Sequence, residues 1–482
     1  MEDLKVRAVR GGLAKVVAQA ANLFLRLGTL MILARLLDPT DFGLVAMVTV
    51  LTGLLNLFRD FGLSTAAVQR TNITEEQIST LFWINVLIGI GLTCLTAASA
   101  PLIVAFYGEP RLFWVTIALA SAFLLNAVGI QHSAMLQRRM RFVVLATLDI
   151  VSLFVSVAIG IGMATRGFGY WALVGMTLAH PFAYSTLVWI SAFWIPGRPS
   201  KAAGIGSVIR FGGTLTLNGV IVYTAYNLEK VLLGRSWGAD ALGIYGRGYQ
   251  LANIPVEGLN SAVGQVAMSA LSRIKEDPDR LRSYFLKGYS LVVSITVPIT
   301  ISCALFANDL VLVLLGPRWL EVSPVFRLLA PTILVFAMIN PTFWLLVPLG
   351  LVGRSLKIAL VLAPLVIVGY VLGLPYGPVG VALGYSVVMM LWVVPHLAWC
   401  VHGTPISLMD ILRAVSRPLV AGAVSAALAW ATVAVFLHSD SHVFRLVLGI
   451  AALLVAYIVG LFYVMGQKSF YIDVVRSISG RT

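Results

Sequence analysis

Charged residues are scarce in this chain. Asp, Glu, Lys and Arg make up 11% of its 482 residues, whereas they make up about 25% of a soluble globular protein. Hydrophobic residues make up 59%, the mean hydropathy is +0.93, and only short polar connections separate the apolar runs. The composition excludes a soluble globular protein and leaves no room for a sizeable domain outside the membrane. It predicts an integral membrane protein made of helices.

Several signatures of chemistry are also missing. The three cysteines, Cys94, Cys303 and Cys400, form no CxxC motif and have no histidine at ligand spacing, which argues against disulfides and against a metal site. No Walker glycine loop occurs, so we expect no ATP hydrolysis by the chain itself. No outer loop is long enough to carry catalytic groups. We therefore predict a protein that is not an enzyme and has no cofactor.

The net charge of +14 does not indicate nucleic-acid binding, because the basic residues are dispersed in short loops. With the N-terminus inside, twenty-four Lys and Arg fall in inner segments and six in outer loops. This positive-inside asymmetry predicts an even number of spans with both termini in the cytoplasm. No small-residue cleavage site closes the first apolar run, so we expect its helix to act as an uncleaved anchor.

The apolar runs predict about fourteen transmembrane helices. The expected spans are 13–37, 42–64, 79–106, 112–135, 142–165, 168–195, 208–233, 241–272, 284–308, 322–349, 355–374, 377–400, 412–437 and 443–466.

An internal repeat relates the two halves of the chain. Arg35 and Gly43 lie at the junction of the first two spans, and Arg235 and Gly243 lie with the same spacing at the junction of the seventh and eighth. Six spans separate the copies, which preserves their direction through the membrane and predicts lobes related by an axis along the membrane normal. We expect an N-terminal six-helix lobe at 1–195, a cytoplasmic linker at 196–207, a second six-helix lobe at 208–400, and two further helices with a cytoplasmic tail at 401–482.

Specific motifs add a family resemblance. They are RLLDPTDFGL at 35–44, FRDFGL at 58–63, QRxxxTEEQISTLFWIN at 69–85, DIVS at 149–152 and YGRGYQL at 245–251. With these motifs the whole chain resembles the oligosaccharide flippases of bacterial polysaccharide export, whose superfamily also contains the lipid II flippases and the multidrug and toxin extrusion transporters. The resemblance implies residence in the bacterial inner membrane.

Polar residues in the first span recur at helical spacing. Lys15, Gln19, Asn22, Arg26 and Thr29 fall on one face of a helix. The Arg26 guanidinium near mid-span keeps its charge, so it needs water, a partner or an anionic ligand. One possibility is that Arg26 ties two helices together or reaches the membrane interface. The alternative is that it lies in a water-filled, cationic cavity, where the paired N–H donors of its guanidinium would hold a diphosphate.

The seventh and eighth spans carry the other candidates. Lys230 and Arg247 are cations inside the spans, with snorkelling to the interface as the alternative. Amides and a carboxylate suit sugar hydroxyls, which both donate and accept, and tyrosines either stack on sugars or form an interfacial belt. The predicted substrate-binding residues are Arg26, Asn22, Lys230, Arg247, Gln250, Asn253, Asn260, Tyr223 and Tyr226.

Three residues suggest how transport is driven. Glu257 and Asp149 are candidates for coupling to protons or sodium ions, since desolvation raises the pKa of a buried carboxyl. Pro255 removes one backbone hydrogen bond from its helix, which makes it either a hinge for alternating access or a static kink.

The resemblance and the cationic spans together predict a flippase. Its substrate would be an undecaprenyl-diphosphate-linked oligosaccharide, moved from the cytoplasmic to the periplasmic leaflet for exopolysaccharide, capsule or O-antigen assembly. Its other partners would be the lipid bilayer and the polysaccharide polymerase and export machinery. The alternatives are a multidrug exporter of the same superfamily, whose cavity should be acidic or apolar, and a membrane-embedded polymerase or ligase.

Overall fold

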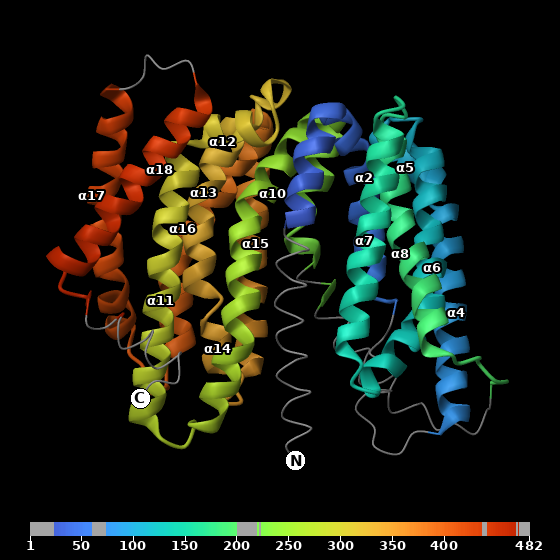
Figure 1. Cartoon of the computed structure of the whole chain (residues 1–482), viewed down its shortest axis with the longest axis horizontal. Coiled ribbons are helices and arrows are strands. Elements are labelled where there is room, and N and C mark those ends of the chain that lie inside the picture. The colour runs from blue at the N-terminus through green and yellow to red at the C-terminus, as the bar shows by residue number, and fades with distance from the viewer. Residues whose placement is uncertain are drawn as a thin grey trace. The chain divides into compact units, whose positions relative to one another are not determined.

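The computed structural model describes residues 24–59, 74–199, 219–220, 223–435, 441–468 and 471. Every regular element in these ranges is a helix (Figure 1). Ten stretches within them are long and apolar enough to cross a membrane, and one of these, Val352–Val401, contains two packed helices. The protein is therefore an all-α integral membrane protein, as predicted, with about fourteen transmembrane helices.

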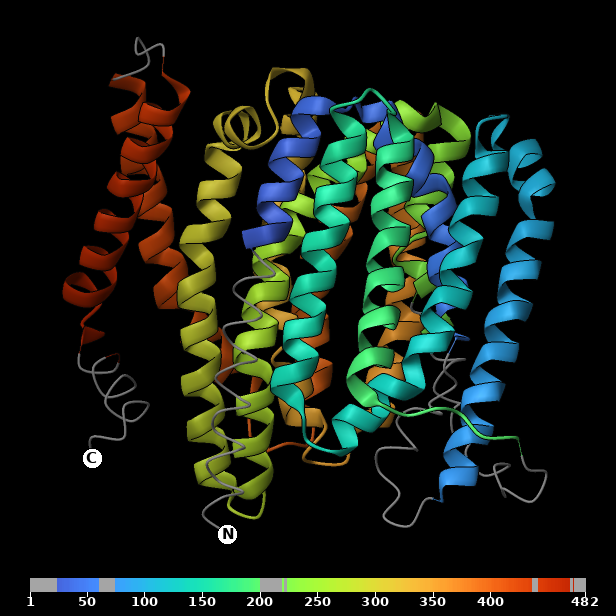
Figure 2. The ribbon, with the colours of Figure 1, turned by 45° about the vertical axis from the view of Figure 1, so that its right-hand side comes forward.

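The chain divides into two compact units, Met1–Gly243 and Ile244–Thr482. In the first unit, residues 24–36 are helical. The elements that follow are α2 (Pro39–Asn56), α4 (Glu75–Ala98), α5 (Ala100–Tyr107), α6 (Leu112–Arg138), α7 (Phe142–Ala164), α8 (Tyr170–Ala192) and the start of α10 (Leu228–Arg273). Within this unit α6 packs between α4 and α8, and α7 packs on α8 (Figures 1 and 2).

Local sequence explains where these helices begin. Asp38 and Asp41 form a capping box at the start of α2, with Pro39 in its first turn. At the start of α4, the Gln77 amide donates to Thr74 Oγ1 at 3.2 Å, and Gln77 Oε1 accepts from the Thr74 amide at 3.1 Å. These bonds satisfy amide groups that have no partner inside the helix.

Within the first unit, each repeat glycine lies against the backbone of the other copy of the repeat. A Cβ atom added to Gly43 would lie 1.7 Å from the backbone oxygen of Ala239, and one added to Gly243 would lie 1.9 Å from that of Pro39. Thr40 Oγ1 also donates to Asp240 Oδ1 at 3.3 Å. The contact is therefore reciprocal between equivalent positions of the repeat, and only glycine allows the backbones to come this close. We call it the glycine crossing.

The second unit contains the rest of α10 and the C-terminal helices. These are α11 (Pro278–Leu305), α12 (Ala307–Leu314), α13 (Val322–Ile339), α14 (Thr342–Leu346), α15 (Val352–Gly373), α16 (Gly377–Val401), α17 (Leu408–Val435) and α18 (His442–Val459), with a π-helical turn at Gly460–Val464. α11 packs on α13 and α17, and α16 packs on α13 and α15. Buried side chains of α11, among them Phe285, Tyr289 and Val293, form part of the core.

The last two helices are fastened to α11 by polar contacts as well as by packing. The Arg282 guanidinium donates to both carboxylate oxygens of Asp410 on α17, at 2.6 and 3.0 Å. On α18 the Tyr457 hydroxyl donates to the Ser294 carbonyl at 2.9 Å. Bidentate pairs of this kind fix orientation more firmly than a single bond. Figure 2 shows α17 and α18 in red at one end of this unit.

Most predicted spans coincide with helices to within a few residues, although those at 13–37, 42–64 and 208–233 lie partly outside the described residues. Several boundaries differ. The helix expected at 42–64 ends at Asn56, and the span expected at 322–349 is divided at Asn340 and Pro341 into α13 and α14. The connection expected around 272–283 is shorter, because α10 continues to Arg273 and α11 starts at Pro278. Asp277 Oδ1 accepts from the Arg280 amide at 3.1 Å, and this cap starts the helix in polar sequence. The span expected at 79–106 is divided at Ser99 into α4 and α5. The predicted lobe boundaries at 195, 207 and 400 remain predictions.

Candidate functional site

Most of the candidate residues lie along α10, which is divided at Gly238. This glycine has φ 83° and ψ −173°, a conformation that is essentially restricted to glycine. The break falls where the sequence predicted a junction between the spans 208–233 and 241–272. The candidates therefore belong to two segments, one before Gly238 in the first unit and one from Ile244 onward in the second unit.

The second segment carries a polar stripe. We use this name for Arg247, Gln250, Asn253 and Glu257, whose spacings of three, three and four residues place them on one face. The Arg247 guanidinium donates to Gln250 Oε1, and Asn253 Nδ2 donates to Glu257 Oε1 at 2.6 Å. Arg247, Gln250 and Asn253 are half-buried, and Glu257 is exposed. The stripe thus holds one cation, one carboxylate and two amides, all able to exchange bonds with a polar ligand.

The segment also contains two other predicted residues, Pro255 and Asn260. Pro255 lies inside α10, where the backbone keeps its helical angles on both sides. The helical backbone at Asn260 is described, but its side chain lies outside the described residues. A row of tyrosine rings lies at the start of the segment, with Tyr249 6.3 Å from Tyr245 and 6.5 Å from Tyr385 between ring centroids. Tyr245 and Tyr385 are fully buried, so these rings pack within the unit.

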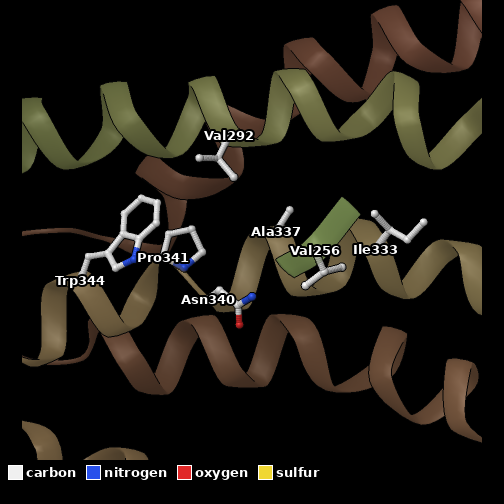
Figure 3. Close-up of a pocket in the computed structure, with 7 residues that line it drawn as sticks. All are labelled: Val256, Val292, Ile333, Ala337, Asn340, Pro341 and Trp344. Atoms are coloured by element: carbon white, nitrogen blue, oxygen red, sulfur yellow. The ribbon is translucent and has the colours of Figure 1, made fainter. Parts of the chain in front are cut away.

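A small cavity lies next to Pro255 in the second unit. Its volume is about 10 Å³, and Val256, Val292, Ile333, Ala337, Asn340, Pro341 and Trp344 line it. Figure 3 shows Val256 close to Ala337, both with apolar side chains. This space suits about one water molecule, so it is too small for a sugar or a phosphate.

The first segment presents different chemistry. Asn227 forms two hydrogen bonds with residues close to it in the sequence. Its Nδ2 donates to the Tyr223 carbonyl at 2.9 Å, and its Oδ1 accepts from Lys230 Nζ at 2.6 Å. The Tyr223 hydroxyl donates to the Val50 carbonyl of α2 at 3.0 Å. Tyr226 is half-buried on this segment. Tyr223 and Asn227 line a cavity of about 350 Å³ in the first unit, whose other walls are mostly apolar side chains of α2, α5 and the segment 224–231.

The remaining candidates lie apart from α10 in the sequence. Arg26 is exposed on the helix at 24–36, and Thr29 on that helix is buried and donates to the Leu25 carbonyl at 2.6 Å. Asn22 lies outside the described residues. Asp149 on α7 is half-buried, and its carboxylate lies 3.5 Å from His180 Nε2 on α8. Within the described ranges, no group of three or more His, Cys, Asp or Glu residues is placed to hold a metal ion.

Two residues of interest were not predicted as site residues. The Arg235 guanidinium, a marker of the repeat in the sequence, lies 5.8 Å from the ring centroid of Phe106, which lines the large cavity. Glu229 is fully buried. The repeat spacing that pairs Arg235 with Gly243 could have pointed to the arginine, but no periodicity distinguishes a buried glutamate from an exposed one.

A comparison with known protein families shows which family this chain belongs to. The family described as "Polysaccharide biosynthesis protein" matches residues 32–324, more than half of the chain. The chain belongs to this family. The match includes the glycine crossing, the first segment of α10 and the polar stripe.

Relatives of this polysaccharide biosynthesis protein cover much of its length. The lipopolysaccharide biosynthesis protein WzxC of Escherichia coli strain K12 is 27% identical over 400 residues, which are 81% of this chain and 80% of the relative. The succinoglycan biosynthesis transport protein ExoT of Rhizobium meliloti strain 1021 is 23% identical over 315 residues, 65% of this chain and 64% of the relative.

Solved structures show the same fold. The lipid II flippase MurJ in an inward closed conformation matches with a TM-score of 0.74 at 13% identity, covering 97% of this chain and 100% of that chain. An inward-facing multidrug transporter of the MATE family matches with a TM-score of 0.60 at 14% identity, covering 82% and 96%. At these identities the likeness concerns the fold alone.

Proposed function

We propose that this protein is a flippase that moves undecaprenyl-diphosphate-linked oligosaccharide repeat units from the cytoplasmic to the periplasmic leaflet of the bacterial inner membrane. The observation that carries the proposal is the family match over residues 32–324, joined to a lipid II flippase fold over nearly the whole chain. The names of its relatives, a lipopolysaccharide biosynthesis protein and a succinoglycan transport protein, agree with a substrate of this class.

The physical problem is the head group. A diphosphate with attached sugars loses its hydration if it enters about 30 Å of hydrocarbon, and nothing there replaces the lost hydrogen bonds. A flippase therefore has to supply cations and hydrogen-bonding groups along the route. The polar stripe supplies both, since its arginine suits phosphate oxygens and its amides suit hydroxyl groups.

The proposed roles follow from this chemistry. Arg26 and Arg247 contact the diphosphate, and Asn22, Gln250, Asn253, Asn260, Tyr223 and Tyr226 contact the sugars. Lys230 adds a second cationic region. Glu257 or Asp149 takes up a proton or a sodium ion, and Pro255 acts as a hinge. Both termini lie in the cytoplasm, and a polymerase with its export machinery consumes the product on the periplasmic side.

The alternatives fit less well. A multidrug exporter for cationic compounds needs an acidic or apolar cavity, whereas the polar stripe and the first segment together carry three cations, Arg247, Lys230 and Arg235, against two carboxylates, Glu229 and Glu257. A polymerase or ligase needs catalytic groups on an outer loop, and the sequence offers no loop of that length.

Deletion of the gene tests the proposal directly. The deletion strain is expected to lose surface polymer and to accumulate repeat-unit lipid that a membrane-impermeant glycosidase cannot reach in intact spheroplasts. A strain lacking the polymerase is the matched control, since its accumulated repeat units should be accessible. Normal polymer in the deletion strain, or accumulated units that the glycosidase cleaves, would contradict a flippase.

Arg26 provides a second, residue-level test. Arg26→Ala should reduce polymer export, and Arg26→Lys should retain part of it, because lysine keeps the charge but loses the fork. Full export by the Ala variant at normal protein levels would remove Arg26 from the proposed diphosphate site.

A further inference from the structure

Nine of the fourteen residues that line the large cavity of the first unit are apolar, and three of the five polar ones have hydrogen bonds within the protein. Ser99 Oγ donates to the Thr96 carbonyl at 2.7 Å, and the Tyr223 hydroxyl donates to the Val50 carbonyl at 3.0 Å. Asn227 uses its amide on Tyr223 and Lys230. Because these groups bond within the protein, the cavity offers little to water, which needs two to four polar partners.

The size and position of the cavity suit a hydrocarbon chain. Its volume of about 350 Å³ accommodates roughly ten carbon groups, if each takes a volume close to the about 30 Å³ of a water molecule. Its walls come from α2 and from the span Glu75–Tyr107, both apolar enough to cross a membrane. Leu102 and Phe106 line it while remaining 72% and 45% exposed, so the cavity opens to the outside of the unit at lipid-facing side chains.

Two cations flank this apolar space. Lys230 Nζ lies 2.6 Å from the lining residue Asn227, and the Arg235 guanidinium lies 5.8 Å from the ring of the lining residue Phe106. The carboxylate of Glu229 in the same segment is fully buried, whereas Lys230 is half-buried and Arg235 is exposed. A ligand with a chain in the cavity would therefore hold its head group beside two positive charges.

We propose that this cavity binds the polyprenyl chain of the lipid-linked substrate near its head group, with Lys230 and Arg235 facing the diphosphate. The inference rests on the proposed function. It commits to the polyprenyl chain because a diphosphate carries more negative charge than a phospholipid head group and therefore gains more from two cations at the rim.

Photo-crosslinking in lipid nanodiscs tests the site. Undecaprenyl diphosphate with a diazirine in its chain is expected to label residues of α2, α5 and the segment 223–231. Ser99→Phe and Val50→Phe fill the cavity, and each should lower this labelling about tenfold, which corresponds to about 1.4 kcal/mol. Leu87→Phe is the matched control, because Leu87 is 70% exposed on α4 and does not line the cavity. The melting temperatures of both cavity-filling variants are measured, and labelling is compared for the variant whose melting temperature equals that of the wild type.

A second arm identifies the source of the chain. Phosphatidylglycerol carrying the same diazirine should label these residues much less at equal mole fraction, and Lys230→Gln should lower labelling by undecaprenyl diphosphate by a larger factor than labelling by phosphatidylglycerol. Equal labelling by both lipids would overturn the proposal, since the occupant would then be an acyl chain of the bilayer. Absence of labelling, or labelling unchanged in a folded filling variant, would overturn it too.

The polymer assay separates this inference from the proposed function. If the wild-type gene restores surface polymer to the deletion strain but its cavity is not labelled, the chain site is wrong and the flippase stands. If the wild-type gene does not restore polymer, the flippase proposal and the inference built on it both fail.

Discussion

The two segments on either side of Gly238, residues 223–237 and the part of α10 from Ile244 onward, differ in how they use polar residues. Before Gly238, the polar groups of Tyr223 and Asn227 are bonded within the protein beside an apolar cavity. After it, the polar stripe pairs side chains of the same helix, Arg247 with Gln250 and Asn253 with Glu257. Bonds between exposed or half-buried neighbours are easily exchanged for bonds to a ligand, whereas bonds to a backbone carbonyl in a packed wall are not.

This difference matches the two halves of an amphipathic substrate. A segment that hides its polar groups presents a surface for hydrocarbon, and a segment that displays them presents a surface for a diphosphate and sugars. One chain can therefore serve both halves of a lipid-linked oligosaccharide, provided that the helix changes direction between them, as it does at Gly238.

The largest expected effect comes from removing the cation of the polar stripe. Arg247→Ala should reduce polymer export about 10- to 100-fold, because a hydrogen bond to a charged group contributes about 1.5–3 kcal/mol. Arg247→Lys should keep part of the activity, since it retains the charge. Surface polymer measured at matched protein levels checks this. Wild-type export by the Ala variant would mean that the stripe does not differ in function from the rest of α10.

A substitution at Gly238 tests whether the break between the segments is required for stability. Gly238→Ala places a Cβ on a residue with φ 83°, which should destabilise the protein by about 1–3 kcal/mol. Gly246→Ala is the matched control on the same helix, because a Cβ there meets nothing within 4 Å, and it should be neutral or slightly stabilising. Thermal unfolding in detergent compares the two. Equal melting temperatures would show that the change of direction at Gly238 is not required.

A smaller loss is expected on the other side of the break. Lys230→Ala should lower polymer export about fivefold, less than Arg247→Ala, because an ammonium contacts phosphate as a point charge without the arginine fork. The export assay used for Arg247 gives the comparison. A loss equal to or larger than that of Arg247→Ala would reverse our assignment of the two segments.

The smallest effect should come from an ion pair outside both segments. Arg111 donates to both oxygens of Glu109 at 2.8 Å, and this hydrogen bonding holds the pKa of the Glu109 carboxyl below its ordinary value of 4.5. A lowered pKa stabilises the fold above the ordinary value and loses that contribution as the pH falls through the folded-state value. Glu109→Gln should therefore cost at most about 0.5 kcal/mol at neutral pH, because solvent screens the pair.

The pH dependence supplies the control for this variant. Melting temperatures of the wild type and of Glu109→Gln should converge at acidic pH, where the carboxyl is protonated in both states of the wild type. A difference that persists or grows in acid would point to a packing effect of the substitution.

The sequence predicted the helices well because bilayer thickness fixes the length of an apolar run. The expected spans 112–135 and 377–400 match α6 and α16 closely. Polar sequence hid the true start of α11 at Pro278, which depends on a cap by Asp277. The break in α10 at Gly238 falls in the junction expected between the spans 208–233 and 241–272.

The candidate site was harder to predict for a physical reason. Helical spacing is enough to tell which of Arg247, Gln250, Asn253 and Glu257 share a face, because that depends on local geometry alone; their role in binding stays a prediction. The cavity beside Tyr223 depends on side chains that are more than a hundred residues apart in the sequence, such as Val50 and Thr224. Periodicity within one helix contains no information about such contacts.

The glycine crossing has a consequence for how this sequence can change over generations. At positions 43 and 243 the obstacle to a larger residue is a main-chain carbonyl, of Ala239 and Pro39 respectively, and every amino acid carries one. No compensating substitution at the facing position can make room, as it could where two side chains collide. A genetic selection that starts from Gly43→Ala should therefore yield true revertants, and suppressors that map to residue 239 should be missing.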